Sequence, residues 1–237
     1  MKDADDTSRA AGRKPRAGAE AARYAVLRRL GPVLKHDMVV NLQAISMMAE
    51  VLNARIERAA PSPADFQANI SKLNRLAREA VASCLKVAAW IEPGEDQGIR
   101  LAEGVDECMA LLASNFNFRG FAVTRDVDET DFQVWRIAVR NLLVVSLITL
   151  TDTATGPCHV HVKAEVRNGI AEISVQVSPR EDPVDALSFE PSYRHLDWAD
   201  VQALADAESV ELMRDGDRIT MRMPRAVATA PLQIAPV

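Results

Sequence analysis

Apolar residues recur at every third or fourth position through the first part of the chain, which is the spacing of one face of an α-helix. A first stripe passes through Leu27, Leu30, Leu34, Met38, Leu42, Ile45, Ala49, Leu52 and Ile56. After a break at "AAPSP", a second stripe passes through Phe66, Ile70, Leu73, Ala77, Ala80, Cys84, Val87 and Ile91. Gly31-Pro32 is expected to start the first helix, and Ser62 is expected to cap the second. The pattern predicts two long amphipathic helices.

Two such helices joined by a short turn form an antiparallel hairpin, which we expect to occupy residues 23–92. A hairpin alone leaves one side of each apolar stripe uncovered. Two hairpins packed into a four-helix bundle cover both sides, so the pattern predicts a homodimer.

The pattern changes after the linker "EPGEDQG", residues 92–98. A buried helix is expected in "DFQVWRIAVRNLLVVSLITLTDTA", and two strand pairs follow, joined by Asn168-Gly169 and Asp215-Gly216, dipeptides that readily take positive φ. Between the strand pairs we expect an irregular acidic loop, about Pro179 to Asp197, and a short helix near Trp198 to Ala207. The fold class is therefore α+β: residues 99–225 are expected to form an α/β sandwich with a largely antiparallel or mixed sheet covered by helices on one face.

The 237 residues carry a formal net charge of -5, which gives no electrostatic reason to expect a nucleic acid as partner. The basic cluster lies in residues 1–22, which lack the apolar block of a signal peptide or a membrane span, so no membrane partner is expected. We expect these residues to form a disordered tail, and residues 226–237 to form a C-terminal tail.

The three cysteines are far apart and lack CxxC spacing, which argues against a disulfide framework and a zinc site and favours a reducing cytoplasm. Each cysteine is expected to be a small buried residue. His159 and His161 share one face of an expected strand, but no acidic or thiol partner lies near them in sequence, so we expect no metal site.

A His-Asp pair stands inside the first helical stretch, in "LKHDMVV". His36 lies two positions from both Leu34 and Met38, so on a helix its side chain points about 200° away from the apolar stripe and into solvent. Its face also carries three partly apolar side chains, Val40, Gln43 and Met47, which is typical of a docking surface. Two alternatives stay open: a merely solvated histidine, or a periodicity displaced by one residue, which would place these side chains inside.

A neutral imidazole is a nucleophile toward phosphorus near neutral pH, and the neighbouring Asp37 can orient the ring, accept its other proton or serve as a general base. The stretch "HDMVVNLQAI" resembles the H-box of two-component histidine kinases, in which a histidine followed by an acid opens a stretch that ends in a Leu-x-x-Ile-like sequence. Asn41 stands where those kinases usually carry a proline. The resemblance implies that His36 is a phosphoacceptor and Asp37 an assisting carboxylate.

The resemblance also implies an ATP-binding domain after the hairpin, and the order of elements fits from about Arg100 to Met223. "RNLLVVSLITL" resembles the N-box with Asn141 at its opening, but Val145 occupies the place of the asparagine that holds magnesium. Ser178 occupies the place of the aspartate that contacts adenine, and "RHLDWADVQALADAESVEL" has no glycine where a phosphate-binding turn belongs. We therefore expect an ATPase fold without cofactor or metal; an unrelated α/β domain with the same order of elements is the alternative.

This combination resembles the ChpT-type histidine phosphotransferases and, in overall plan, the sporulation phosphotransferase. The resemblance implies that His36 passes phosphoryl groups between the aspartates of response-regulator receiver domains without ATP, and that the receiver supplies the magnesium. Receiver domains, with a hybrid histidine kinase as a further candidate, are the expected partners, and they are expected to contact Val40, Gln43 and Met47. One alternative is a non-catalytic, pseudokinase-like dimeric adaptor that regulates a receiver or a kinase; another is an active kinase with an unusual nucleotide site.

Overall fold

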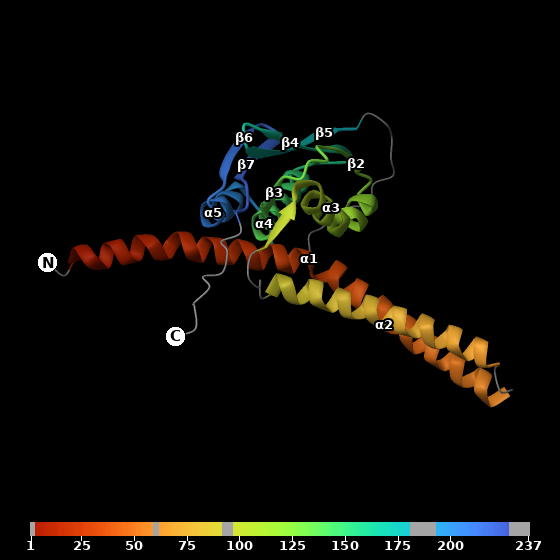
Figure 1. Ribbon diagram of the computed structural model, residues 1–237. Helices are drawn as coiled ribbons and strands as arrows, with labels where there is room; N and C mark the ends of the chain where they lie inside the picture. The colour runs from red at the N-terminus through yellow and green to blue at the C-terminus, as the bar shows by residue number, and fades with distance from the viewer. Residues whose placement is uncertain (1–2, 59–61, 92–96, 181–192, 228–237) are drawn as a thin grey trace, which may run out of the picture. The chain divides into compact units, whose positions relative to one another are not determined.

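The structure is a computed structural model that describes residues 3–58, 62–91, 97–180 and 193–227 (Figure 1). Parts of the expected linker, of the expected acidic loop and of the expected C-terminal tail lie outside the described residues: 92–96, 181–192 and 228–237. The chain divides into two compact units, Leu30–Gly94 and a second unit that combines Met1–Arg29 with Glu95–Val237. Within the described ranges, no helix has the length and the apolar character that a membrane crossing requires.

The first unit is a hairpin made from part of α1 (Asp3–Arg58) and all of α2 (Pro63–Ile91). The second helix begins where the sequence predicts, because Ser62 Oγ accepts a hydrogen bond from the Asp65 N–H at 3.2 Å and so caps the first turn. Between the helices, Asn41 Nδ2 donates to Ser83 Oγ at 2.9 Å. A polar pair inside an apolar seam favours one register of the two helices over the others.

The seam of the hairpin differs in part from the predicted stripe. Its buried and half-buried positions on α2 are Asn69, Leu73, Leu76, Ala77, Ala80, Ser83, Val87, Ala89 and Trp90. Phe66 and Ile70, which the sequence places in the stripe, are 42% and 37% exposed. The reason is the width of the apolar arc of α2, which exceeds what one neighbouring helix covers.

The start of α1 corrects two expectations. The helix begins at Asp3 and continues through Gly31 and Pro32, where a start was expected. Residues 17–22, expected to belong to a disordered tail, are helical, and Ala19 and Ala22 are 1% and 0% exposed. Alanine is the strongest helix former, and its small side chain lets a helix pack closely. Proline at position 32 removes one helical hydrogen bond, which the rest of a long helix tolerates.

The second unit contains two sheets. A small one pairs β1 (Gly98–Arg100) with β3 (Gln133–Trp135). The main sheet has the order β2-β4-β5-β7-β6, in which β2 and β4 are parallel and the other neighbours are antiparallel. Its strands are β2 (Ala122–Val127), β4 (Cys158–Arg167), β5 (Ile170–Pro179), β6 (Glu211–Asp215) and β7 (Arg218–Pro224). The sheet is therefore mixed, and both expected strand pairs are confirmed, with positive φ at Asn168, Gly169 and Gly216.

Three helices cover one face of the main sheet, α3 (Leu101–Phe118), α4 (Arg136–Asp152) and α5 (Trp198–Glu208) (Figure 1). Along β4, β5 and β7, buried residues alternate with less buried ones, so each strand turns one row of side chains toward the helices. Helix α4 is buried along most of its length and forms the centre of the core. The α+β class and the helix-covered mixed sheet agree with the sequence analysis.

Candidate functional site

His36 lies on the exposed side of α1. Leu34, two positions earlier, is only 6% exposed, so the helix turns the His36 side chain about 200° away from a buried position. Asp37 is also exposed and lies about 100° around the helix from His36. Among the described residues, none forms a hydrogen bond or an ion pair with either side chain. The imidazole is therefore accessible to an incoming electrophile.

The three other predicted site residues continue the His36 face along α1. Val40, Gln43 and Met47 follow the histidine at intervals of four, seven and eleven residues, which places all four side chains on one side of the helix. Val40 and Met47 are 46% and 62% exposed, and Gln43 is exposed as well. At a rise of about 1.5 Å per residue, this strip is about 16 Å long. The strip is an exposed, partly apolar surface directly beside the His36 ring.

A second exposed apolar surface, which we call the bundle face, lies on another side of the hairpin. It comprises Leu42 and Ile56 of α1 and Phe66, Ile70 and Val81 of α2, which are 37% to 58% exposed. Viewed from the N-terminus of its own helix, each of these residues lies about 40–100° around the helix axis from the buried seam, and the direction of rotation is the same for α1 and α2. Because the helices run antiparallel, the same sense brings both sets to one face.

The residues of α4 that resemble an N-box are buried or bonded within the protein. Val145 is fully buried in the core and presents no oxygen to a cation. Asn141 is 6% exposed, and its Nδ2 donates a hydrogen bond of 2.9 Å to Glu208 Oε1. Ser178 lies near the end of β5. Of the described residues, no group of three or more His, Cys, Asp or Glu could hold a metal ion.

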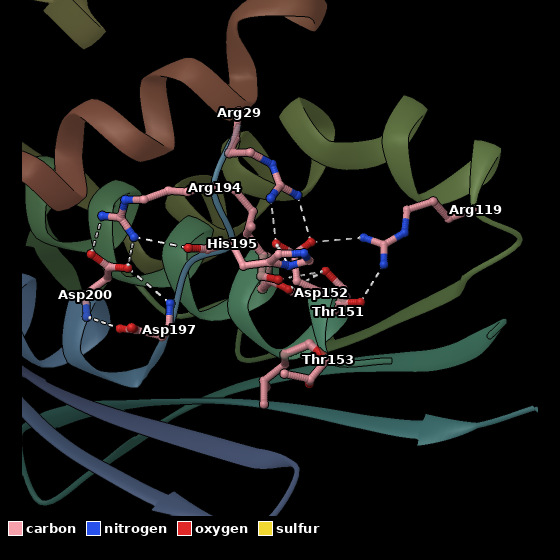
Figure 2. Close-up of polar contacts among 12 residues, drawn as sticks. Arg29, Arg119, Thr151, Asp152, Thr153, Arg194, His195, Asp197 and Asp200 are labelled. Carbon is pink, nitrogen blue, oxygen red and sulfur yellow. Dashed lines mark hydrogen bonds and ion pairs between the residues drawn. The ribbon is translucent and has the colours of Figure 1, made fainter. Parts of the chain in front are cut away.

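The N-terminus of α5 is the place where the resemblance implies phosphate binding, and carboxylates occupy it. Asp197 Oδ1 accepts a hydrogen bond from the Asp200 N–H, and Asp200 Oδ2 accepts one from the Asp197 N–H, both at 3.1 Å. Arg194 also binds both carboxylate oxygens of Asp200, each at 2.7 Å (Figure 2). Burial raises the pKa of Asp200, but the hydrogen bonds from Arg194 and Asp197 outweigh it and hold the pKa below its usual range. The residues present do not fit a bound phosphate here.

A buried ion-pair cluster surrounds Asp152 at the C-terminus of α4 (Figure 2). The two guanidinium nitrogens of Arg29 donate to the two Asp152 oxygens at 2.6 and 2.7 Å. Arg119 donates to Asp152 Oδ1 at 3.5 Å and to the Thr151 carbonyl at 2.5 Å. The Asp152 side chain is 1% exposed, while His195, whose Nδ1 lies 3.6 Å from Oδ2, is 65% exposed. A carboxylate at a helix C-terminus is electrostatically unfavourable, and the two arginines compensate it.

This ion-pair cluster was not predicted from the sequence. Its members come from α1, from the residue after α3, from the end of α4 and from the segment before α5, so no short motif joins them. Residues 17–29 had also been assigned to a tail and to the hairpin, which separated Arg29 from its partners.

The thiols behave as small buried side chains in two of three cases. Burial raises the pKa of Cys108 to about 12 and that of Cys158 to about 11, which keeps both thiols protonated and unreactive. Cys84 is exposed, contrary to the expectation that each cysteine is buried. Its place just outside the hairpin seam, on the wide apolar arc of α2, accounts for the difference.

No protein-family model matches the chain, and no curated protein matches it. The chain is similar to the catalytic domain of histidine kinase ThkA, with 15% identity over 56% of this chain and 97% of that one and a TM-score of 0.44. It is similar to the Acinetobacter baumannii histidine kinase AdeS, with 11% identity over 78% of this chain and 96% of that one and a TM-score of 0.42. A bacterial phosphotransferase is similar with 16% identity over 82% of this chain and 93% of that one, at a TM-score of 0.37.

Proposed function

We propose that this protein is a histidine phosphotransferase that passes phosphoryl groups between receiver-domain aspartates through His36. The observation that carries the proposal is the exposed His36-Asp37 pair on a long helix, within a stretch that resembles an H-box. An unprotonated ring nitrogen of His36 attacks the phosphorus of an aspartyl phosphate; the N–P bond forms, the acyl P–O bond breaks, and the receiver aspartate leaves as a carboxylate. The same step in reverse delivers the phosphoryl group to a second receiver. Asp37 assists by flanking the ring.

Receiver binding is assigned to the strip that follows His36. Val40, Gln43 and Met47 lie on the same helix face as the histidine and are exposed. A receiver that covers this strip buries apolar surface only when its aspartyl phosphate is beside the ring, which couples binding to orientation. Magnesium belongs to the receiver in this proposal.

We assign the phosphoryl donor to a protein because the described residues of the α/β unit lack groups that the resemblance assigns to ATP binding. The magnesium-holding asparagine is replaced by the buried Val145, and the Asn141 amide is bonded to Glu208. At the N-terminus of α5, Asp197 and Asp200 use the backbone N–H groups that would bind a phosphate. We place this protein's role in transfer and not in autophosphorylation.

We also propose that the protein acts as a homodimer in which the bundle faces of two hairpins pack together. Five apolar side chains exposed on one face of a hairpin are costly in water, and a second copy covers them with side chains of the same kind. The His36 strip lies on a different side of α1, so dimer formation leaves it free for a receiver.

The test is a transfer assay with two phosphoryl sources. The full chain is incubated with a receiver carrying radiolabelled aspartyl phosphate and, separately, with labelled ATP and magnesium. We expect label on the protein from the receiver alone, stable to base and labile to acid, as a phosphohistidine is. His36→Gln abolishes labelling, whereas His159→Gln, an exposed histidine on β4, serves as the matched control and leaves it unchanged.

The other outcomes decide between the alternatives. A stable complex with the receiver but no label on His36 refutes phosphotransfer in favour of an adaptor. Label from ATP that depends on His36 refutes the assignment of a protein donor and establishes a kinase.

A further inference from the structure

Residues 17–29 of α1 pack on the helix layer of the α/β unit as a third layer. Their inward side consists of small or apolar residues that are 0% or 1% exposed: Ala19, Ala22, Ala25 and Val26. A Cβ at Gly18 would lie 3.5 Å from the Ala203 Cβ of α5, which is ordinary van der Waals contact. Small side chains let the backbones of two helices approach closely, so this is a packed interface and not a loose tail.

The border of this interface pairs arginines of the segment with acids of the domain. Arg23 donates to Glu208 Oε1 at 2.7 Å, and Arg29 binds both oxygens of Asp152. The Arg28 guanidinium lies 5.5 Å from the centre of the Tyr193 ring, which Tyr24 also contacts edge-on at 6.1 Å. The segment is thus basic where the domain is acidic, and aromatic contact adds to the ion pairs.

The same contacts reach the N-box-like residues of α4. Glu208 Oε1 accepts hydrogen bonds from both Arg23 and Asn141, so one carboxylate joins the segment to the amide that the resemblance places at a nucleotide site. At this border the domain contributes two carboxylates, Glu208 and Asp152, against the one guanidinium of Arg119, so these groups carry an excess of negative charge. Polyphosphates are repelled by such a face, whereas a helix bordered by arginines is attracted to it.

We propose that residues 17–29 are an intramolecular ligand of the α/β unit, held on the acidic α4–α5 face in place of a nucleotide. The domain holds a positively charged helix of its own chain where the resemblance implies a negatively charged nucleotide. This inference rests on the proposed function only in that both expect no ATP, and it makes no use of His36.

The test is a charge exchange followed by hydrogen–deuterium exchange on the full chain. Arg23→Glu and Glu208→Arg each place like charges in contact, and we expect amides 17–29 to exchange at least about tenfold faster in either variant. The double variant restores an opposite-charge pair and recovers much of the protection. Arg75→Glu, at the exposed Arg75–Glu79 pair of α2, is the matched charge reversal and leaves amides 17–29 unchanged.

Amides of β4 and β5 monitor folding in the same experiment, so a variant that simply unfolds is recognised. Equal exchange of residues 17–29 in the wild type and both single variants overturns the proposal. Protection that disappears on dilution of the protein overturns it in favour of docking onto a second copy. Saturable binding of a fluorescent ATP analogue with magnesium to the wild type also overturns it. Failure of phosphotransfer to His36, with amides 17–29 still protected, refutes only the proposed function.

Discussion

The Asp152 cluster allows a quantitative prediction for the variant Asp152→Asn. The substitution keeps the size of the side chain but removes its charge, leaving Arg29 and Arg119 without their carboxylate. Their side chains are only 6% and 8% exposed, so water does not replace the lost partner. Burial already lowers the pKa of Arg119, and Asp152 opposes that shift, which shows that the carboxylate stabilises the buried charge.

Breaking a buried ion pair by removing one partner costs about 3–5 kcal/mol. For a unit of this size, roughly 2–4 °C of melting temperature accompany each kcal/mol, so we expect a fall of roughly 6–20 °C. The exposed Arg75–Glu79 pair, with side chains 64% and 46% exposed, provides the comparison. Glu79→Gln is expected to change stability by no more than about 0.5 kcal/mol.

The measurement is urea unfolding followed by tryptophan fluorescence in a Trp90→Phe background. Trp135 and Trp198 then report the α/β unit alone, because Trp90 is the tryptophan of the hairpin. A loss below about 1 kcal/mol for Asp152→Asn would refute the reasoning, since it would mean that water or another group compensates both arginines.

Four further predictions follow from other parts of the chain. Val81→Glu places a charge on the bundle face and is expected to convert the dimer to monomer in analytical ultracentrifugation, whereas Ser71→Glu, on another side of α2, leaves a dimer; a dimeric Val81→Glu protein would rule out this interface. Met47→Glu is expected to slow phosphotransfer from a receiver about tenfold or more by weakening the complex, and an unchanged rate would remove Met47 from the receiver contact. The pKa of Asp200 is lower in the folded than in the unfolded chain, so its stabilising contribution is complete above the unfolded pKa of about 3.9 and is lost as the pH falls through the folded pKa. Asp200→Asn should therefore unfold more easily in urea at pH 7 and lose less stability than the wild type between pH 4 and pH 2.5; parallel curves would contradict this. Ellman's reagent at pH 8 should modify Cys84 rapidly and Cys108 and Cys158 only in denaturant; a fast phase that survives Cys84→Ser would show that a buried thiol is accessible.

The hairpin shows where periodicity predicts well and where it does not. The spacing of apolar residues locates α2, its cap at Ser62 and the outward position of His36, because these depend on neighbours within a few residues. The stripe alone does not tell which part of a wide apolar arc meets the partner helix. Phe66 and Ile70 were placed in the seam, but they lie on the bundle face, and only the packing of α1 against α2 decides between these positions.

The start of α1 shows where prediction from composition fails, because the order of this segment depends on residues far along the chain. Residues 17–22 consist of four alanines, one glycine and one glutamate and contain no large apolar side chain, so by composition they resemble a disordered tail. The arginines that follow them, Arg23 and Arg29, pair with Glu208 and Asp152, which lie far along the chain at the ends of α5 and α4. A basic, alanine-rich segment becomes ordered when the fold offers it an acidic surface, and the sequence of the segment does not contain that surface. The two proposals therefore support each other: if this face binds no phosphate, it is free to carry the acidic side chains that hold the chain's own arginines.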